Sequence, residues 1–282
     1  MSKIDLHIHT TASDGTFSPK EVVMNSRAKD LKAIAITDHD TVDGIEEALQ
    51  AGKQQGIEVI PGVELSVNYP KGEMHILGYF IEHKSKCLQY ELKLLQKHRE
   101  ERNPQVIAKL NQLGIEVTMQ EAIEISGGKL VGRPHIAALL KEKGYVSCIQ
   151  EAFDQYLAKG KPAYVAKEKL TPQEGIQIIK QAGGIAILAH PKHLGHSDIE
   201  LEELLRELKN FGLDGLEVYY TTQREKDTNK YLSLCAKFSL LATGGTDFHG
   251  DNKPEIELGV GRGNLIIPYY LVERMKERVE SL

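Results

Sequence analysis

Residues 4–16, IDLHIHTTASDGT, contain the pattern from which the fold of this 282-residue chain follows. Apolar side chains alternate here with ionisable ones, Ile4, Leu6 and Ile8 against Asp5, His7 and His9. Alternation at period two predicts a β-strand with one apolar face. Two imidazoles and a carboxylate on the other face are costly to bury unless a partner satisfies them. The rest of the sequence therefore has to supply a partner for these polar side chains.

The composition is that of an ordinary globular protein, with 41% hydrophobic and 27% charged residues. No run approaches the roughly 18 apolar residues that a membrane helix needs, and the first residues do not form an apolar signal region. Cys87, Cys148 and Cys235 lie far apart without CxxC spacing, so we expect free thiols and a cytoplasmic location. The formal charge of −5 argues against a basic nucleic-acid-binding surface. This net charge is compatible with an anionic substrate if bound metal ions supply positive charge at the site.

Short apolar segments follow the first strand and alternate with amphipathic helical stretches. Six further strands are predicted, at residues 32–37, 57–67 with an interruption at Pro61-Gly62, 74–80, 184–190, 214–220 and 240–247. Helix starts are marked by SPKE at 18–21 and TPQE at 171–174, each with a capping hydroxyl, a proline and a glutamate in the required order. This alternation predicts a mostly parallel sheet in an α/β protein. Seven strands suit a barrel like the (β/α)₈ fold with one unit missing or distorted.

Residues 86–170 interrupt the alternation with helical stretches. A long amphipathic helix with a bend at Pro104 is predicted first, and two shorter helices follow in RPHIAALLKEKG and SCIQEAFDQYLAKG. The sequence therefore predicts a first barrel part at 1–97, a helical insertion domain at 98–165 and a second barrel part at 166–282. The insertion is either a lid that contacts substrate or a stabilising addition, and elements at barrel mouths commonly set specificity.

Six of the eleven histidines lie where a predicted strand begins or ends: His7, His9, His39, His75, His190 and His249. In barrel enzymes the carboxyl ends of the strands carry the chemistry. His75 opens its strand instead of closing it, but a hairpin turn at residues 69–72 would put Ser66 opposite His75 and Glu64 diagonal to it. Glu64 therefore joins Asp14 and Asp247 as a carboxylate close to these histidines.

Imidazoles together with carboxylates are the ligand set that Mn, Fe or Zn prefers, rather than Ca or Mg alone. Nine such residues exceed what one ion needs, and they suit two or three divalent ions with open positions for water and substrate. The candidate metal ligands are His7, His9, Asp14, His39, Glu64, His75, His190, Asp247 and His249.

These residues lie in segments that resemble the successive motifs of the PHP (polymerase and histidinol phosphatase) family. The segments are DLHIHTTASDGT, ITDHDTVDG, PGVELS, HILGY, LAHP and GGTDFHG, and in this order they cover the chain outside the helical insertion. The amidohydrolase superfamily also opens its barrel with HxH, but the bridging lysine that it usually carries late in a central strand is not evident in this sequence.

The resemblance implies a distorted (β/α)₇ barrel with a trinuclear metal site. Carried over by motif, the ligands of a first metal are His7, His9, Glu64 and Asp247. Glu64 would bridge to a second ion held also by His75 and His190, and the third ion would have Asp14, His39 and His249. Ions in such a site lower the pKa of a water and supply hydroxide for attack on a phosphate ester. Glu64 and His190 are the expected catalytic residues, with His190 one candidate for protonating the leaving oxygen.

The insertion resembles that of the family branch with 3′,5′-nucleoside bisphosphate phosphatases and 5′→3′ exoribonucleases, through GRPHIA at 132–137 and GKPAYV at 160–165. This branch implies a manganese-dependent phosphoesterase, with iron or zinc as alternative metals. Its expected substrate is the 3′-phosphate of a nucleoside bisphosphate, or a short 5′-phosphorylated oligoribonucleotide. Arg133 and His135 are then candidates for binding the substrate's second phosphate.

Two alternatives stay open at this stage, a histidinol-phosphate phosphatase and a non-catalytic PHP scaffold that binds metal. Neither a membrane nor an obligate protein partner is expected. Asp5, Asp38 and Asp40 flank predicted ligands, and we expect them to orient the neighbouring imidazoles.

Overall fold

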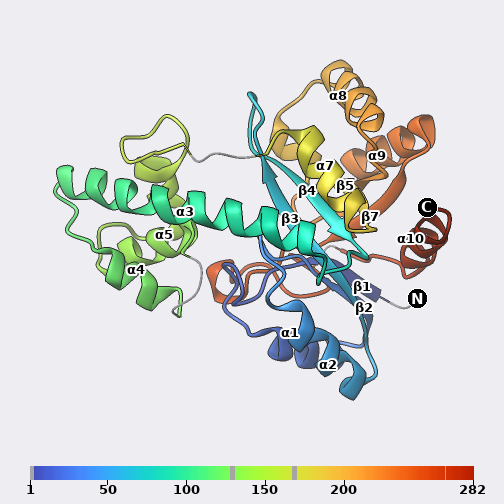
Figure 1. The fold of residues 1–282 in the computed structure, drawn as a ribbon, viewed down its shortest axis with the longest axis horizontal. Coiled ribbons are helices and arrows are strands. Elements are labelled where there is room, and N and C mark those ends of the chain that lie inside the picture. Colours follow the sequence, from blue (N-terminus) through green and yellow to red (C-terminus); the bar gives the residue numbers. More distant parts are fainter. Residues whose placement is uncertain (1–2, 128–130, 167–169, 264) are drawn as a thin grey trace.

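A computed structural model describes residues 3–127, 131–166, 170–263 and 265–282. Its strands are β1 (Lys3–Ile8), β2 (Leu31–Ile36), β3 (Glu58–Val67), β4 (Met74–Tyr79), β5 (Ile185–Leu188), β6 (Gly215–Tyr220) and β7 (Leu241–Gly245). They form one sheet in sequential order (Figure 1). The Asp247 N–H donates to the His7 carbonyl at 2.9 Å, and the His9 N–H donates to the Phe248 carbonyl at 2.9 Å. The chain after β7 thus bonds to β1 and nearly closes the sheet, which confirms the predicted distorted (β/α)₇ barrel.

The distortion of the barrel lies at β4, which is antiparallel to both β3 and β5, whereas the other neighbouring pairs are parallel. The β3–β4 hairpin pairs Ser66 with His75, as the sequence predicts. The predicted interruption of β3 at Pro61-Gly62 is wrong, because the strand runs through both residues. Pro61 lies where the ladder to β2 ends and the ladder to β4 begins, and a residue without an N–H is tolerated at such a point.

Helices cover the outside of the barrel. They are α1 (Pro19–Ala28), α2 (Ile45–Gln55), α7 (Pro172–Gln181), α8 (Asp198–Asn210), α9 (Glu225–Phe238) and α10 (Tyr270–Glu280), with short 3₁₀ turns η2 (Pro191–Leu194) and η3 (Gly250–Asn252). Both predicted capping boxes are present, at Ser18 before α1 and at Thr171 before α7. In each box the hydroxyl accepts the N–H of the glutamate three residues on, whose carboxylate accepts the cap N–H in return.

The insertion consists of α3 (Lys86–Gln112), α4 (Met119–Ile125), α5 (Arg133–Glu142), α6 (Ile149–Ala152) and the π-helical turn η1 (Phe153–Leu157). α3 continues through Pro104 as one helix and joins two hydrophobic cores. Its Leu88, Leu92 and Leu95 pack in the barrel core, whereas Val106 and Leu110 pack in a separate core with α4 and α5. The boundary predicted after residue 97 falls inside this helix, between the two cores.

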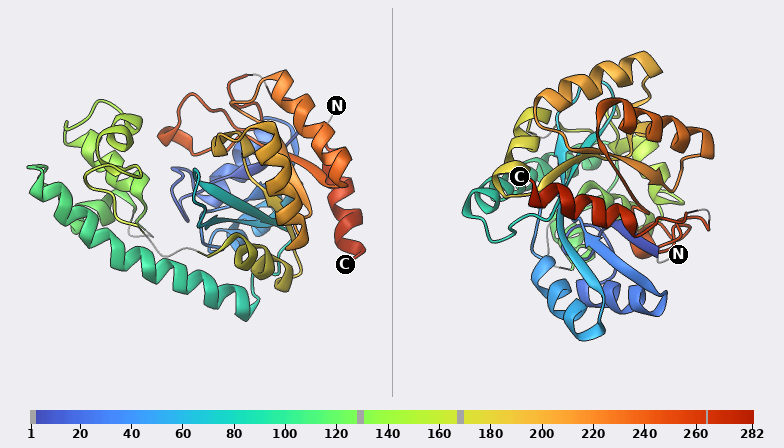
Figure 2. Two further views of the ribbon diagram at one scale, coloured as in Figure 1. Left: turned by 90° about the horizontal axis from the view of Figure 1, so that it is seen from above. Right: turned by 90° about the vertical axis from the view of Figure 1, so that its right-hand side faces the viewer.

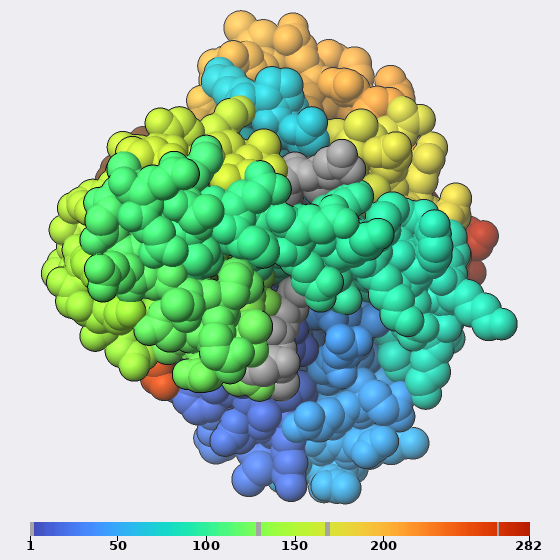
Figure 3. Space-filling view, turned by 60° about the vertical axis from the view of Figure 1, so that its left-hand side comes forward, coloured from blue at the N-terminus to red at the C-terminus, as the bar shows by residue number. Residues whose placement is uncertain are grey.

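The insertion stands beside the barrel, and α3 runs from the barrel to the insertion's far side (Figure 2, left). Seen from that side, the insertion lies in front of much of the barrel (Figure 3). The sequence reading missed α4, although TMQE at 118–121 has the same capping pattern as SPKE and the box is formed. Among the described helices, none combines the length and the apolar character needed to cross a bilayer.

We expect Gly245→Ala to destabilise the barrel at its closure. A Cβ at this position would lie 2.2 Å from the Cβ of His7, and backbone atoms of β1 leave it no room. The free energy of unfolding should fall by roughly 3 kcal/mol, measured by chemical denaturation. Gly183→Ala is the control, because its Cβ would meet no atom within 4 Å and only its φ of 74° opposes the change, at a cost of about 1 kcal/mol. Equal losses in the two variants would contradict close packing of β7 against β1.

Candidate metal centre

The structure brings all nine candidate ligands to one end of the barrel. His7 lies in β1, Glu64 in β3 and His75 in β4, while His9, Asp14, His39, His190, Asp247 and His249 follow the carboxyl ends of β1, β2, β5 and β7. Carboxyl ends of parallel strands meet at one edge of a barrel. Because β4 runs in the opposite direction, its first residues lie at that same edge. His75, near the start of β4, is therefore close to the other candidate ligands.

Glu64 occupies the middle of the cluster with 1% of its surface exposed. Its Oε2 lies 3.2 Å from His7 Nε2, 3.1 Å from His9 Nε2 and 3.1 Å from His39 Nδ1. Its Oε1 lies 2.8 Å from His75 Nδ1 and 3.1 Å from His190 Nε2. One carboxylate therefore faces five imidazoles, which come from β1, β4 and the segments after β1, β2 and β5, and this is the position expected of a group that bridges neighbouring ions.

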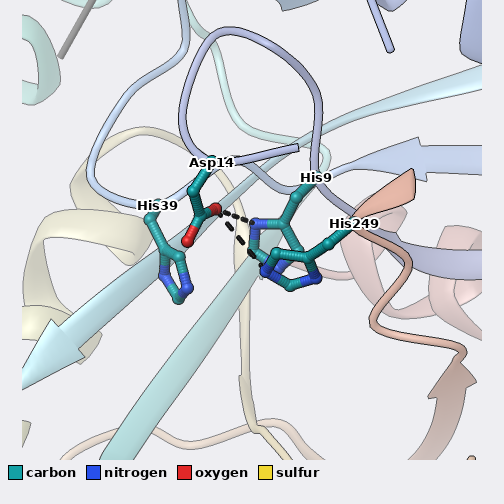
Figure 4. A group of neighbouring side chains, drawn as sticks. All are labelled: His9, Asp14, His39 and His249. Carbon is teal, nitrogen blue, oxygen red and sulfur yellow. Dashed lines mark ion pairs between the residues drawn. The ribbon is translucent and has the colours of Figure 1, made fainter. Parts of the chain in front are cut away.

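Three groups of ligand atoms have all their members within 4.8 Å of one another. They are His7, His9, Glu64 and Asp247; His39, Glu64 and His75; and His9, Asp14, His39 and His249. The first group coincides with the four residues that the family resemblance implies for one ion. In the third group, Asp14 Oδ1 lies 3.6 Å from His9 Nδ1 and 3.5 Å from His249 Nε2 (Figure 4). Its members converge from three separate loops.

Several buried nitrogen and oxygen atoms of this cluster have no hydrogen-bond partner among the described residues: His7 Nε2, both ring nitrogens of His9, His39 Nδ1, His190 Nδ1 and Glu64 Oε2. Buried polar atoms are nearly always paired, so such a concentration indicates an ion or water between them. Burial lowers the pKa of His39 and of His249 to about 3 each, so both imidazoles are neutral at pH 7. A neutral imidazole is the form that coordinates a metal, so His39 and His249 fit a divalent ion as they stand. Nearby carboxylates raise the pKa of His9 to about 9 and that of His7 well above its usual value, so an ion that binds these two rings would displace protons.

Glu217 in β6 hydrogen-bonds to two residues of the cluster, and the sequence analysis did not predict it. It is fully buried, its Oε1 accepts from His7 Nδ1 at 2.9 Å, and its Oε2 accepts the His190 N–H at 2.6 Å. The bond at Nδ1 leaves the Nε2 lone pair of His7 directed at Glu64 and Asp247. A charged residue within the apolar strand GLEVYY was the available signal.

Asp5 and Asp38 act on backbone and hydroxyl groups, so the expectation that they orient imidazoles is wrong for both. Asp5 accepts from the Thr246 N–H and hydroxyl at 2.9 and 2.6 Å and from the Gly259 N–H at 2.8 Å. Asp38 accepts from the Thr10 N–H and hydroxyl at 2.7 Å each. Burial raises the pKa of Asp5 to about 6, although these three bonds and a fourth from the His7 N–H at 3.3 Å favour the charged form. Both carboxylates fix the loops that carry ligands.

Three arginines from the insertion line a cavity of about 130 Å³ beside the cluster. Arg99 and Arg102 come from α3 and Arg133 from the start of α5, and Asp14, His39 and His75 of the barrel also line the cavity. We call this space the arginine pocket. Arg99 pairs with the buried carboxylate of Asp40, and Arg133 donates to Glu73 at 2.8 Å. The pocket places three guanidinium groups next to the candidate metal ligands.

Arg102 is the most deeply buried of the three arginines, with 6% of its surface exposed. Its guanidinium donates to the amide oxygen of Asn103 at 2.6 and 3.2 Å. Burial and the charges of Arg99 and Arg133 lower the pKa of Arg102 to about 9. It stays charged at pH 7, in a place where an anion would relieve the repulsion. The sequence reading identified Arg133 but missed Arg99 and Arg102, whose spacing of three puts them on one helix face.

His135 does not line the arginine pocket, although the sequence singled it out together with Arg133. Its ring Nδ1 accepts the Gly132 N–H at 2.9 Å and so caps the start of α5. Asp40 links the pocket to the barrel, since its carboxylate also accepts the Ser66 N–H at 3.1 Å from β3. Asp40 itself has a φ of 54°, directly after His39.

Comparison with known proteins agrees with this geometry. Residues 5–198 match the PHP domain family. The chain is 38% identical over 248 residues to a 5′-3′ exoribonuclease of Haemophilus influenzae, covering 88% of this chain and 90% of the relative. It is 32% identical over 260 residues to a 3′,5′-nucleoside bisphosphate phosphatase of Chromobacterium violaceum, covering 92% and 91%. A structure from Bifidobacterium adolescentis, described as a candidate metal-dependent phosphoesterase, superposes with a TM-score of 0.88 at 28% identity, over 98% of this chain and 96% of that one.

The match to the PHP domain and the relatives named as phosphatase and exoribonuclease identify a metal-dependent phosphoesterase, and the imidazoles and carboxylates clustered at the strand ends fit that class. The chain belongs to the PHP family, because the match to the PHP domain spans more than half of its length.

We expect Glu217→Gln to weaken divalent-metal binding without unfolding the barrel. Glu217 receives two N–H donors, one on each oxygen, and glutamine offers one oxygen for both. The lost orientation of His7 should raise the Kd for Mn²⁺ about 10- to 100-fold, measured by calorimetry. Glu257→Gln is the control, because that exposed carboxylate pairs with Lys29 at 3.0 Å, on the surface of the protein. Unchanged affinity in Glu217→Gln would show that its contact with His7 is irrelevant to the metal.

Proposed function

We propose that this protein is a manganese-dependent phosphatase that removes the 3′-phosphate from nucleoside 3′,5′-bisphosphates. One observation carries the proposal: a cluster of metal-ligand residues and a separate pocket of three arginines share the wall formed by Asp14, His39 and His75. The arrangement offers two neighbouring places for phosphate groups, one supported by metal ions and one by guanidinium groups. A nucleoside bisphosphate has two phosphates separated by a single sugar.

In the proposal, two or three divalent ions lie among the nine clustered residues. A first ion has His7, His9, Glu64 and Asp247, a second has Glu64, His75 and His190, and a third has Asp14, His39 and His249. Bound there, the ions would neutralise phosphate charge and lower the pKa of a nearby water. Manganese is the first choice, and iron or zinc would also accept this ligand set.

The protein's own residues position these groups before substrate arrives. Imidazoles hold the pKa of the buried Glu64 carboxyl well below its usual range, although burial alone would raise it, so Glu64 is charged and available to bridge. Tyr220 and Lys253 donate to Asp247 Oδ2 at 2.9 and 2.6 Å, which leaves Oδ1 directed at His9 at 3.2 Å. We assign His190 to the second ion. Its alternative role is to protonate the leaving 3′-oxygen.

The arginine pocket is assigned to the 5′-phosphate. Planar guanidinium groups match phosphate oxygens in pairs, and bonds between ionised partners are the strongest hydrogen bonds in proteins. The guanidinium of Arg133 lies 5.8 Å from the ring centres of both Phe153 and Tyr164, which restrict its position. His135 contributes indirectly in this proposal, by fixing the helix start that carries Arg133.

The two alternatives fit the site less well. Histidinol phosphate has one phosphate and an ammonium group, so it would leave Arg102, which donates only to the neutral amide of Asn103, without an anion. A scaffold without turnover gives no reason for burying Arg102 beside two other cations, since each buried charge costs folding free energy. The relatives named as an exoribonuclease and as a bisphosphate phosphatase agree with a nucleotide substrate.

A panel of substrates with Mn²⁺ tests the proposal. Adenosine 3′,5′-bisphosphate should be hydrolysed with a much higher kcat/KM than adenosine 3′-phosphate or histidinol phosphate. Arg102→Gln should raise the KM for the bisphosphate about tenfold or more and leave the 3′-monophosphate little changed. Its thermal stability should stay equal or rise, because a buried, repelled cation is removed.

Arg278→Gln provides the matched control, because its guanidinium binds Asp214 at 3.1 Å on another face of the barrel. Preference for histidinol phosphate, or equal effects of Arg102→Gln on mono- and bisphosphate, would refute the assignment of the arginine pocket. Metal binding without hydrolysis of any phosphate ester would favour the scaffold.

Glu64→Gln should abolish activity while the barrel stays folded. An amide cannot serve ions on both sides as a carboxylate does, so we expect at least about a hundredfold loss of kcat and fewer bound metal ions by elemental analysis. Glu58→Gln is the control on the same strand, at the opposite end, where Glu58 pairs with Lys276 at 2.7 Å. A fully active Glu64→Gln protein would contradict the bridging role.

A further inference from the structure

Two side chains of α3 contact the barrel residue that directly follows His39. Arg99 pairs with the carboxylate of Asp40, and Gln96 Nε2 donates to the Asp40 carbonyl at 3.1 Å. Residues three apart lie on one face of a helix, so both contacts come from the same face of α3. They lie on the stretch of α3 between its two hydrophobic cores. Arg99 and Asp40 are 8% and 0% exposed, so the ion pair between insertion and barrel is buried.

Asp40 has a backbone conformation that needs support from its surroundings. Its φ of 54° lies in the left-handed region, which is disfavoured for residues with a Cβ. Its N–H donates to the Glu64 carbonyl at 3.0 Å, and its carboxylate accepts the Ser66 N–H at 3.1 Å. Together with Arg99 and Gln96, these contacts give a partner to the N–H, the carbonyl and the carboxylate of Asp40. The barrel and α3 therefore hold this turn jointly.

The turn at Asp40 keeps His39 opposite Glu64. The Glu64 N–H donates to the Asp38 carbonyl at 3.1 Å, and with the bond from the Asp40 N–H this forms a short parallel bridge between His39 and Glu64. The His39 imidazole then lies beside Asp14 (Figure 4), with its Nδ1 3.1 Å from Glu64 Oε2. If the chain left the left-handed turn, the bond from the Asp40 N–H would be lost and His39 would no longer be held in this place.

We propose that Gln96 and Arg99 are positioning residues of the metal centre. Through Asp40 they hold His39 in the place from which it binds its ion. This rests on the proposed assignment of His39 as a metal ligand. It gives the insertion a second role besides lining the arginine pocket, because the ion that uses His39 binds tightly only when α3 contacts the barrel. The ion assigned to the first ligand group does not use His39, so only part of the bound metal depends on α3.

The charge of Arg99 by itself predicts the opposite effect on metal binding. Arg99 and His39 line the same small cavity, so a guanidinium there repels a divalent ion bound to His39. Removing only this repulsion would tighten metal binding, whereas loss of positioning would weaken it. The direction of the change in metal affinity therefore separates the two roles of Arg99.

Gln96→Leu tests the positioning role outside the arginine pocket, since Gln96 lines a separate cavity with Asp43 and Glu100. Leucine keeps most of the bulk and removes the donor to Asp40. In titrations of the metal-free protein with Mn²⁺, followed by calorimetry and elemental analysis, one of the bound ions should lose affinity at least about tenfold. The tightest ion should stay within about twofold, and the melting temperature of the metal-free protein should change little.

The matched control is Gln105→Leu, a change of the same residue type on the same helix. The Gln105 amide donates to the Glu101 carbonyl at 3.2 Å, within α3 itself. Each bound Mn²⁺ should keep its affinity in this variant.

Arg99→Met should weaken the same ion, because it leaves the Asp40 carboxylate buried without its cation. Adding Asp40→Asn should restore Mn²⁺ affinity to within about threefold of the unmodified protein. Asparagine tolerates the left-handed conformation, its amide oxygen can still accept the Ser66 N–H, and no charge is left without a partner. This recovery distinguishes an effect through Asp40 from a general loss of packing around Arg99.

Weaker binding of one ion in Gln96→Leu and in Arg99→Met, with recovery in the double variant, supports the proposal. Unchanged Mn²⁺ binding in Gln96→Leu, tighter binding in Arg99→Met, equal loss of every ion, or no recovery in the double variant overturns it. If Arg99→Met does not fold, the result for Gln96→Leu decides. If the unmodified protein binds no Mn²⁺, the proposed metal-dependent function fails instead, so the two failures are distinguishable.

Discussion

The carboxylate of Glu64, buried among five imidazoles, is the interaction on which the rest of this structure depends. The imidazoles come from β1, β4 and the segments after β1, β2 and β5, so only a barrel with these strands in sequential order brings them around one group. Such a cluster contributes little to stability by itself, because buried polar atoms without partners cost free energy. Its cost is offset elsewhere, by the apolar faces of the same strands. In β1, for example, Ile4, Leu6 and Ile8 are fully buried.

The reversal of β4 solves a positional problem. A parallel fourth strand would place its first residues at the far end of the barrel, away from the other ligands. An antiparallel strand needs only a tight hairpin instead of a crossover helix, and it brings His75 opposite Ser66 and beside Glu64. The chain then leaves β4 at the opposite end and enters α3. α3 packs along the barrel through Leu88, Leu92 and Leu95 and carries Arg99 and Arg102 back to the ligand end. The same reversal therefore delivers one metal ligand and the arginine pocket.

The sequence predicts the parts of this arrangement that depend on local periodicity. Alternation predicted the first strand, short apolar segments predicted the other six, and turn length predicted the Ser66–His75 register, because all three are set by residues close in the chain. Glu217, Arg99 and Arg102 could not be found in this way. A carboxylate in one strand and two arginines on a long helix have the same local pattern whether they face water or a buried site. Their roles exist only through contacts across 210 residues, from Glu217 to His7, or 59 residues, from Arg99 to Asp40. The interruption predicted at Pro61 is wrong because a strand tolerates a proline where one hydrogen-bond ladder ends and the next begins. That position depends on the neighbouring strands and not on the local sequence.

Under the proposed function, an acidic protein of formal charge −5 would select a doubly phosphorylated substrate because three arginines concentrate positive charge in the arginine pocket. Surface cations are screened by salt and discriminate little between ligands. Arg102 is different, since it is 6% exposed and repelled by two neighbouring arginines. A site built around a buried charged donor rejects a ligand that lacks the matching anion, because the donor then stays unpaired. Discrimination between mono- and bisphosphates would therefore come from the desolvation of this one guanidinium more than from the shape of the pocket. The metal-ligand cluster would supply reactivity towards phosphate esters in general and would not contribute to this discrimination.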